Sequence, residues 1–289
     1  MRVLFTGASS PLGGQVLAGL LALEQYSEIW VAIHRRPPAV THPKVRLVKV
    51  HLEDDELDLS EIPAPLDLVI HFAAVTHADN AEAYSRVNFS GTMHLAHAAR
   101  ALGCRRFVYV STRCATEGSG AYGESKLAAE RGLLSLEWDG LLILRPSEIY
   151  GSSSGEGIDQ LLALASRFHI VPLFWGHKGL RFAPLKTTDF VTATTTLIQM
   201  NQTGVHLFEL CGPEDLKASD LALRIAAKYR ALPIPVWWPC LVIGLRILGF
   251  LGLRLIAPDQ LQRLIGKKTA HRSTPNLVLS GMASRFPGS

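Results

Sequence analysis

The sequence predicts an α/β fold: a doubly wound parallel sheet with a smaller C-terminal lobe. Short apolar runs recur through residues 1–150 and are bounded by turn-forming residues, which is typical of strands buried on both faces. Segments of helical period separate these runs, as parallel strands require. After Gly151 the rhythm changes at the flexible stretch GSSSGEG. Residues 151–289 are therefore expected to form a lobe that is interleaved with the first portion and not independent of it.

Each expected element has a local reason. Branched and aromatic residues cluster in six places, and strands are expected there, over 2–5, 28–33, 45–50, 68–72, 107–110 and 141–144. Helices are expected over 12–24, 81–102 and 122–136; Pro11 suits the first turn of the first helix, and Gly103 ends the second. In the lobe, we expect a helix over 158–168, a helix from a cap at Asp189 to about Met200, a strand over 206–210, and a helix opening at Ser219 or Asp220.

Composition limits the class of protein. Of the 289 residues, 48% are hydrophobic and 19% are charged, and the net charge is +4. This allows a large buried core, and the absence of a basic run argues against a nucleic-acid partner. The four cysteines, at positions 104, 114, 211 and 240, form no CxxC pair, so neither a zinc site nor a disulfide framework is expected. Because MRVLFTG opens a strand rather than a signal peptide, we expect a cytoplasmic location.

A glycine-rich turn, TGASSPLGG at 6–14, directly follows the first apolar run. Glycine at position 7 permits a tight turn, and glycine at position 13 lets the next helix pack close to the strand. A dinucleotide pyrophosphate would bind at the positive end of that helix. Serine stands at position 10 where glycine is expected, but its hydroxyl can donate to a phosphate. An ordinary βα turn is the alternative. The predicted cofactor-binding residues here are Gly7, Ser9, Ser10, Leu12 and Gly13.

The end of the second strand indicates which dinucleotide is bound. A cofactor without a 2′-phosphate is usually held there by an acidic residue, whereas this chain has His34, Arg35 and Arg36. Guanidinium groups suit a phosphate dianion. We therefore predict NADP as the preferred cofactor, with NAD as the alternative, and a solvated basic turn as the non-functional interpretation.

Tyr122 and Lys126 form a proton-transfer pair in the predicted third helix. Their spacing places the phenol and the ammonium on one helix face, where the charge lowers the phenol's pKa from about 10. Thr112 ends the preceding strand and offers a hydroxyl to the reacting oxygen. Open α/β sheets bind ligands at the carboxyl ends of their strands. The pair is therefore interpreted as catalytic rather than as a chance surface YxxxK.

Six segments together resemble a known family: TGASSPLGG, DLVIHFAA, VNFSGT, FVYVST, YGESK and LRPSEIYG, in that order. They are similar to the extended short-chain dehydrogenase/reductases, also called the NAD-dependent epimerase/dehydratase family. The resemblance covers the chain to about residue 215. It implies a Rossmann-type NAD(P)-binding domain over 1–150 and a substrate-binding lobe over 151–289. It also implies that Tyr122 is the catalytic base, that Lys126 lowers its pKa and binds the nicotinamide ribose, and that Thr112 is the hydroxyl partner.

The resemblance extends the predicted cofactor site to the ends of other strands. Asn88 would lie near the cofactor, and Pro146 near the nicotinamide. Phe72, Ala73 and Ala74 would line the adenosine side. The family often has Asp-Leu after the third strand, and here the corresponding residues are His51 and Leu52.

Several departures bear on the substrate. Glu148 stands where many nucleotide-sugar members have asparagine, and a carboxylate there would repel a diphosphate unless neutralised. Arg181 resembles the family arginine that grips such a diphosphate. Thr76 and His77 are further candidate substrate-binding residues. No metal is expected, because the i,i+3 histidines on the long helix lack a third ligand.

Three functions stay open. The first is an NAD(P)-dependent oxidoreductase or epimerase acting on a carbinol or ketone, with a small-molecule substrate such as a nucleotide sugar. The second is a reductase or dehydrogenase of a lipophilic alcohol or ketone, for which the apolar stretch 235–258 leaves room. The third is a non-catalytic NADP-binding scaffold or sensor. Within 235–258 a buried helix pair is favoured over an interfacial membrane helix, and a homodimer is compatible with the sequence.

Overall fold

The computed structural model describes residues 1–78, 80–152, 157–175, 179–200, 203–240 and 243. Its centre is a seven-stranded sheet in the order β11-β6-β5-β4-β1-β2-β3, and every neighbouring pair is parallel. The strands are β1 (Arg2–Thr6), β2 (Glu28–Ile33), β3 (Val45–Lys49), β4 (Leu68–His71), β5 (Arg106–Val110), β6 (Gly140–Pro146) and β11 (Gly204–Leu210). This sheet confirms the predicted fold class.

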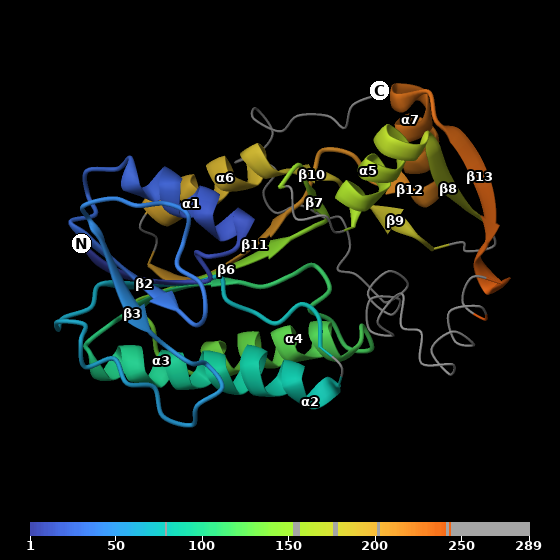
Figure 1. Cartoon of the computed structure of the whole chain (residues 1–289). Coiled ribbons are helices and arrows are strands. Elements are labelled where there is room, and N and C mark those ends of the chain that lie inside the picture. Colours follow the sequence, from blue (N-terminus) through green and yellow to red (C-terminus); the bar gives the residue numbers. More distant parts are fainter. Residues whose placement is uncertain (79, 153–156, 176–178, 201–202, 241–242, 244–289) are drawn as a thin grey trace.

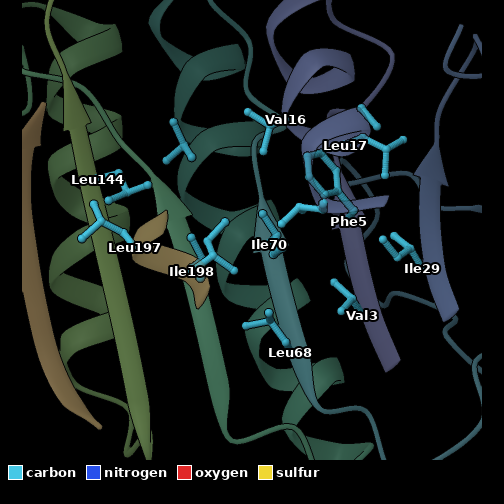
Figure 2. Close-up of a cluster of buried hydrophobic side chains, with 14 of the residues drawn as sticks. Val3, Phe5, Val16, Leu17, Ile29, Leu68, Ile70, Leu144, Leu197 and Ile198 are labelled. Carbon is cyan, nitrogen blue, oxygen red and sulfur yellow. The ribbon is translucent and has the colours of Figure 1, made fainter. Parts of the chain in front are cut away.

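Helices cover both faces of the sheet (Figure 1). On one face lie α1 (Pro11–Leu21) and α6 (Thr187–Gln199), and on the other lie α2 (Ala81–Tyr84), α3 (Gly91–Ala101) and α4 (Ala121–Leu134). Figure 2 shows the core beneath the first face, where Val16 and Leu17 of α1 pack near Phe5 and Ile70 of the sheet. Because helices cover the apolar residues on both faces of the sheet, neither face is open to a ligand. The carboxyl ends of the strands are therefore where a site is expected.

The predicted long helix over 81–102 contains a change of helical type. Between α2 and α3 the segment η1 (Ser85–Ser90) is a π-helix. The chain beside it is tightly packed, since a Cβ at Gly91 would lie 2.4 Å from the carbonyl oxygen of Leu52. Single π-helical turns often mark functional sites, and this one carries Asn88.

The second half of the chain contributes to both parts of the molecule. Strand β11 and helix α6 belong to the main sheet and its covering layer. The remaining elements form the smaller portion: β7 (Ile149–Tyr150), α5 (Ile158–Phe168), β8 (Ile170–Trp175), β9 (Arg181–Phe182), β10 (Leu185–Lys186), β12 (Leu216–Lys217), α7 (Ala218–Tyr229) and β13 (Leu232–Trp237). Asp189 does not cap α6, because that helix already begins at Thr187, whose hydroxyl donates to the carbonyl of Tyr150.

Only residues 235–240 and 243 of the apolar stretch 235–258 are described, and the rest of that prediction lies outside the described residues. Trp238 is buried and packs edge-on against Phe174 of β8, whereas Trp237 is 60% exposed. The helices of the described residues are all too short or too polar to span a bilayer.

Candidate functional site

The glycine turn is built by close backbone approach. Gly7 has a φ of +81°, and a Cβ there would lie 2.5 Å from the backbone nitrogen of Ala73. A Cβ at Gly13 would lie 2.3 Å from the carbonyl oxygen of Gly7. Only glycine fits either position. The Ser10 hydroxyl caps α1: it donates to the Gly7 carbonyl and accepts from the Gly13 N–H at 3.0 Å. The hydroxyl predicted to face a phosphate therefore also closes the turn.

A cavity of about 350 Å³ lies over this turn, at the carboxyl ends of β1, β2 and β4. Ten of the predicted cofactor-binding residues line it: Gly7, Ser9, Ser10, His34, Arg35, Arg36, Leu52, Phe72, Ala73 and Ala74. Six lining residues were not predicted: Thr6, Ala32, Val50, Glu53, Val75 and Val87. The mixture of apolar walls and a rim of polar groups is typical of a pocket for a small organic molecule.

The rim of the cavity joins the glycine turn to the basic segment after β2. The Ser9 hydroxyl donates to the carbonyl of Arg36 at 2.5 Å. The rings of His34 and His51 meet edge to face, 4.9 Å between centroids, although His51 is not among the lining residues. Glu53 also faces the cavity, and Arg86 of η1 pairs with its carboxylate at 2.9 Å. The cavity therefore presents arginines at one rim and a neutralised carboxylate at the other.

The remaining predicted cofactor residues lie outside this cavity: Leu12, Gly13, His51, Asn88, Tyr122, Lys126 and Pro146. Leu12 packs against the core beneath the turn. Pro146 ends β6, opposite Leu210 of β11. Asn88, in contrast, is fully buried. Its side chain makes two hydrogen bonds to Val75 in the loop after β4, accepting from the Val75 N–H and donating to the Val75 carbonyl. It also donates to Ser125 of α4, so one amide fastens this loop to the helix that carries Tyr122.

A buried polar relay supports the floor of the cavity. Oγ1 of Thr6 lies 2.6 Å from Nδ1 of His71, and Nε2 of His71 lies 2.9 Å from Oγ1 of Thr92. Thr92 in turn donates to the carbonyl of Asn88, and Thr6 accepts from the N–H of Ala73. Burial, together with the charge of Lys126, lowers the pKa of His71 to about 3, so the ring is neutral. These contacts fix one tautomer, in which Nδ1 accepts from Thr6 and Nε2 donates to Thr92.

Tyr122 and Lys126 both lie on α4, whose first turn packs against the loop that follows β5. The ring of Tyr122 meets that of Tyr84 edge to face, 6.1 Å between centroids. Thr112 follows β5, and its hydroxyl accepts from the N–H of Cys114 at 3.2 Å. A Cβ at Gly123 would lie 2.2 Å from the carbonyl oxygen of Cys114, so the Thr112 loop packs directly on the start of the helix.

Lys126 is almost fully buried, at 1% exposure. Its Nζ lies 4.1 Å from the centre of the Tyr109 ring, a favourable position for a cation over an aromatic face. Burial lowers the pKa of Lys126 to about 7, although the charge of Glu130 acts in the opposite direction. A lysine with this pKa changes charge near neutral pH, which is where a proton-transfer partner is useful.

The predicted substrate residues are engaged with partners. The Glu148 carboxylate accepts from the N–H of Ala183 at 2.8 Å and lies 3.8 Å from Nη1 of Arg113. The carboxylate therefore has an arginine beside it, which the sequence reasoning missed. Nε of Arg181 donates to the carboxylate of Asp215 at 2.7 Å. Thr76 and His77 contact one another, with 2.9 Å between Oγ1 and Nδ1.

Some of the residues that were not predicted carry no local signal in the sequence. Arg113 directly follows the Ser-Thr pair, but nothing in its neighbours indicates a partner 35 positions away. Glu53 and Val75 stand in loops without a recognisable signature. Within the described residues no group of three or more histidine, cysteine or acidic side chains is placed to hold a metal ion.

The chain is similar to known proteins in sequence and in fold. The model of the NAD dependent epimerase/dehydratase family matches residues 3–215. A ceramide reductase of Caulobacter vibrioides is 32% identical over 176 residues, which cover 59% of this chain and 53% of that protein. A UDP-glucose 4-epimerase of Vibrio cholerae is 27% identical over 201 residues, which cover 59% of this chain and 60% of that protein. The chain thus spans between half and three-fifths of these two curated relatives.

Solved structures share the fold at lower identity. MoeE5, solved in complex with UDP-glucuronic acid and NAD, superposes with a TM-score of 0.68 at 21% identity, over 82% of this chain and 85% of that one. A UDP-galactose 4-epimerase superposes with a TM-score of 0.66 at 17% identity, over 92% and 97% of the two chains.

Proposed function

This chain belongs to the NAD-dependent epimerase/dehydratase family, and from that premise we propose that it is an NADP-linked enzyme that interconverts a carbinol and a ketone. The observation that carries the proposal is the burial of Lys126 one helical turn after Tyr122, on a helix packed against the Thr112 loop. A buried lysine is costly, and a fold without a use for it would replace it with an apolar residue.

The residues present fit a nicotinamide dinucleotide. The Gly7 cradle would be filled by any Cβ, and the cavity above it has arginines at its rim. We assign the pyrophosphate to the N–H groups of the glycine turn and a 2′-phosphate to Arg35 and Arg36. When bound, such a cofactor accepts or donates a hydride at the substrate carbon.

The chain's own contribution is to move a proton and to position the groups around it. Tyr122 Oη takes the carbinol proton in one direction and returns it in the other. The Lys126 ammonium favours the phenolate, and the Thr112 hydroxyl donates to the substrate oxygen. We assign substrate binding to the lobe within residues 151–289, which contains Arg181, and to Glu148 just before that lobe.

A lipophilic ketone or alcohol is the second candidate substrate, beside a nucleotide sugar. Glu148 favours it, because this carboxylate offsets the charge of Arg113 and so weakens the attraction of that arginine for a diphosphate. The ceramide reductase relative is consistent with it. Both classes require the same Tyr122 chemistry.

A substrate panel tests the proposal. Nucleotide sugars and long-chain ketones are incubated with NADPH or NADP, and both nicotinamide absorbance and redox-neutral epimerisation are followed. The wild type should convert one class, and Tyr122→Phe should slow conversion by about 10²–10⁴-fold. Tyr26→Phe, which changes a buried tyrosine of the core, is the matched control and should leave the rate unchanged. Equal rates in wild type and Tyr122→Phe would remove Tyr122 as the base. If NADPH binds but no substrate is converted, the scaffold or sensor interpretation accounts better for the protein.

A further inference from the structure

An alternating chain of charges leads from Lys126 away from the cavity. Glu130 is four residues after Lys126 on α4, so the two side chains share a helix face. Arg145 of β6 grips Glu130 with two hydrogen bonds, of 2.9 and 2.5 Å. Nη1 of Arg145 lies 3.9 Å from Oε1 of Glu209 on β11. The order of charges is therefore positive, negative, positive, negative, across one helix and two strands.

This chain of charges is buried where ion pairs are expensive. Glu130 is 2% exposed, and the Arg145 and Glu209 side chains are 14% exposed. Removing such charges from water is repaid only by good geometry, and an apolar set of similar volume would hold the helix to the strand as well. A role in packing alone therefore does not explain why these residues are charged. An electrostatic effect on a neighbouring group does explain it.

The two members of the pair act on Lys126 in opposite directions. The Glu130 carboxylate stabilises a nearby ammonium, and Arg145 weakens that effect by sharing the carboxylate. The other titratable groups near Lys126 are His71, which is neutral, Tyr109, which is fully buried with a raised pKa, and Tyr122, one helical turn before it. Within the part of the chain that the structure describes, Glu130 is the carboxylate whose charge raises the pKa of Lys126.

We propose that Glu130 and Arg145 are positioning residues that together set the charge of Lys126. The Glu130 carboxylate stabilises the ammonium, and Arg145 limits that stabilisation. Glu209 completes the balance by drawing part of the Arg145 charge toward β11. The effect on the charge of Lys126 does not depend on the proposed function. Only its consequence, the pH range in which Tyr122 transfers a proton, rests on that function.

Unfolding free energy measured against pH reports the charge of Lys126 without any cofactor. The pKa of Lys126 is about 7 in the folded chain and near 10.5 in the unfolded one. The unfolded chain therefore binds the additional proton between these values, and stability rises with pH from about 7 upward. Urea titrations of the full chain from pH 5.5 to 9 locate the onset of this rise, and Lys126→Met should abolish it.

Two variants that break the same ion pair should shift this onset in opposite directions. Glu130→Gln removes the stabilising charge, so the onset should move about one pH unit toward acid. Arg145→Gln releases Glu130, so the onset should move toward alkali by a similar amount. Glu117→Gln disrupts an exposed glutamate–arginine pair, to Arg131 at 2.7 Å, and should leave the onset unchanged. A mechanical role predicts a loss of stability in both variants with no shift, or with shifts of the same sign; either result overturns the inference.

A milder variant keeps the test decisive if either change prevents folding. Glu209→Gln leaves the Glu130–Arg145 hydrogen bonds in place and should produce a smaller acid shift; no shift, or an alkaline one, counts against the inference. NADPH affinity across the same pH range is the second readout, and it should fall as Lys126 loses its proton. If the stability onset moves as expected and the affinity does not follow, the proposed role of Lys126 fails while the charge balance stands.

Discussion

Thr6 and His71 end two neighbouring strands, opposite one another in the parallel register of β1 and β4, and their side chains are joined by a buried contact of 2.6 Å. Thr6 also accepts from the N–H of Ala73, the residue that approaches Gly7 most closely. The neutral imidazole therefore ties the strand that begins the glycine turn to the loop packed against that turn.

Acid should unfold the protein partly through His71. The pKa of His71 is about 3 in the folded chain, against 6.5 for an ordinary histidine. Between these values the unfolded chain binds the additional proton, so stability falls as the pH drops below about 6.5. We expect a loss of about 3 kcal/mol between pH 7 and pH 4 from this residue. Urea titrations should show that His71→Leu lacks this component and that His97→Gln, a change at an exposed helix position, keeps it.

Gly7→Ala should lose more stability than its backbone angle alone explains. Gly118 has a nearly identical φ, +76°, and no atom lies within 4 Å of the place where its Cβ would stand, so Gly118→Ala isolates the cost of the angle, about 1–2 kcal/mol. At Gly7 the backbone at Phe72 and Ala73 must also move. We expect a larger loss in urea titrations and a weaker NADPH affinity in calorimetry. Equal losses in the two variants would show that the close approach is unimportant.

NADPH should bind more tightly than NADH because Arg35 and Arg36 stand at the cavity rim. The double change Arg35→Ala/Arg36→Ala should reduce this preference by at least about tenfold, since each charged hydrogen bond contributes roughly 1.5–3 kcal/mol. Calorimetric titration of both cofactors measures it. Arg46→Ala is the control for lost positive charge. Arg46 lies near the start of β3, at the end of the sheet away from the cavity, where it pairs with Glu28. A preference unchanged by the double variant would contradict the prediction.

Thr112→Val should act mainly on turnover. Valine keeps the shape of threonine but removes the hydroxyl that we assign to the substrate oxygen, and loss of one such donor typically costs about 10²–10³-fold. The fold and the NADPH affinity should survive, because this hydroxyl accepts from a backbone N–H of its own loop, at Cys114. Once a substrate is identified, kcat and KM should be compared with those of Thr192→Val on α6. A fall in NADPH affinity equal to the fall in turnover would assign Thr112 to the cofactor instead.

The sequence predicted the parallel sheet because its strands are apolar runs separated by segments of helical period. It did not predict the π-helical turn at Ser85–Ser90, since a hydrophobic pattern does not distinguish one inserted residue in a long helix. The two-residue strands of the smaller portion carry too few residues to form a pattern. Gly7, Ser9 and Ser10 were correctly predicted to lie together because a local motif encodes them, and all three line the cavity.

Long-range polar contacts explain the rest of what was missed. His71 lies in a run that predicts a buried strand, but its hydroxyl partners are 65 and 21 positions away. Arg113 and Glu148 come together only when the sheet forms. Such pairs depend on which strand ends become neighbours, and no window of sequence contains both members.

The pairing of β11 with β6 has a consequence for how the chain can be divided. The seven residues Gly204–Leu210 lie along the whole of Gly140–Pro146. A fragment ending near residue 150 would therefore leave the hydrogen-bonding groups on one edge of this apolar strand without partners, while β5 still pairs with the other edge. Unprotected edges of this kind recruit strands from other molecules. Expressed alone, residues 1–150 should aggregate, whereas a fragment extended through Leu210 would carry its own covering strand.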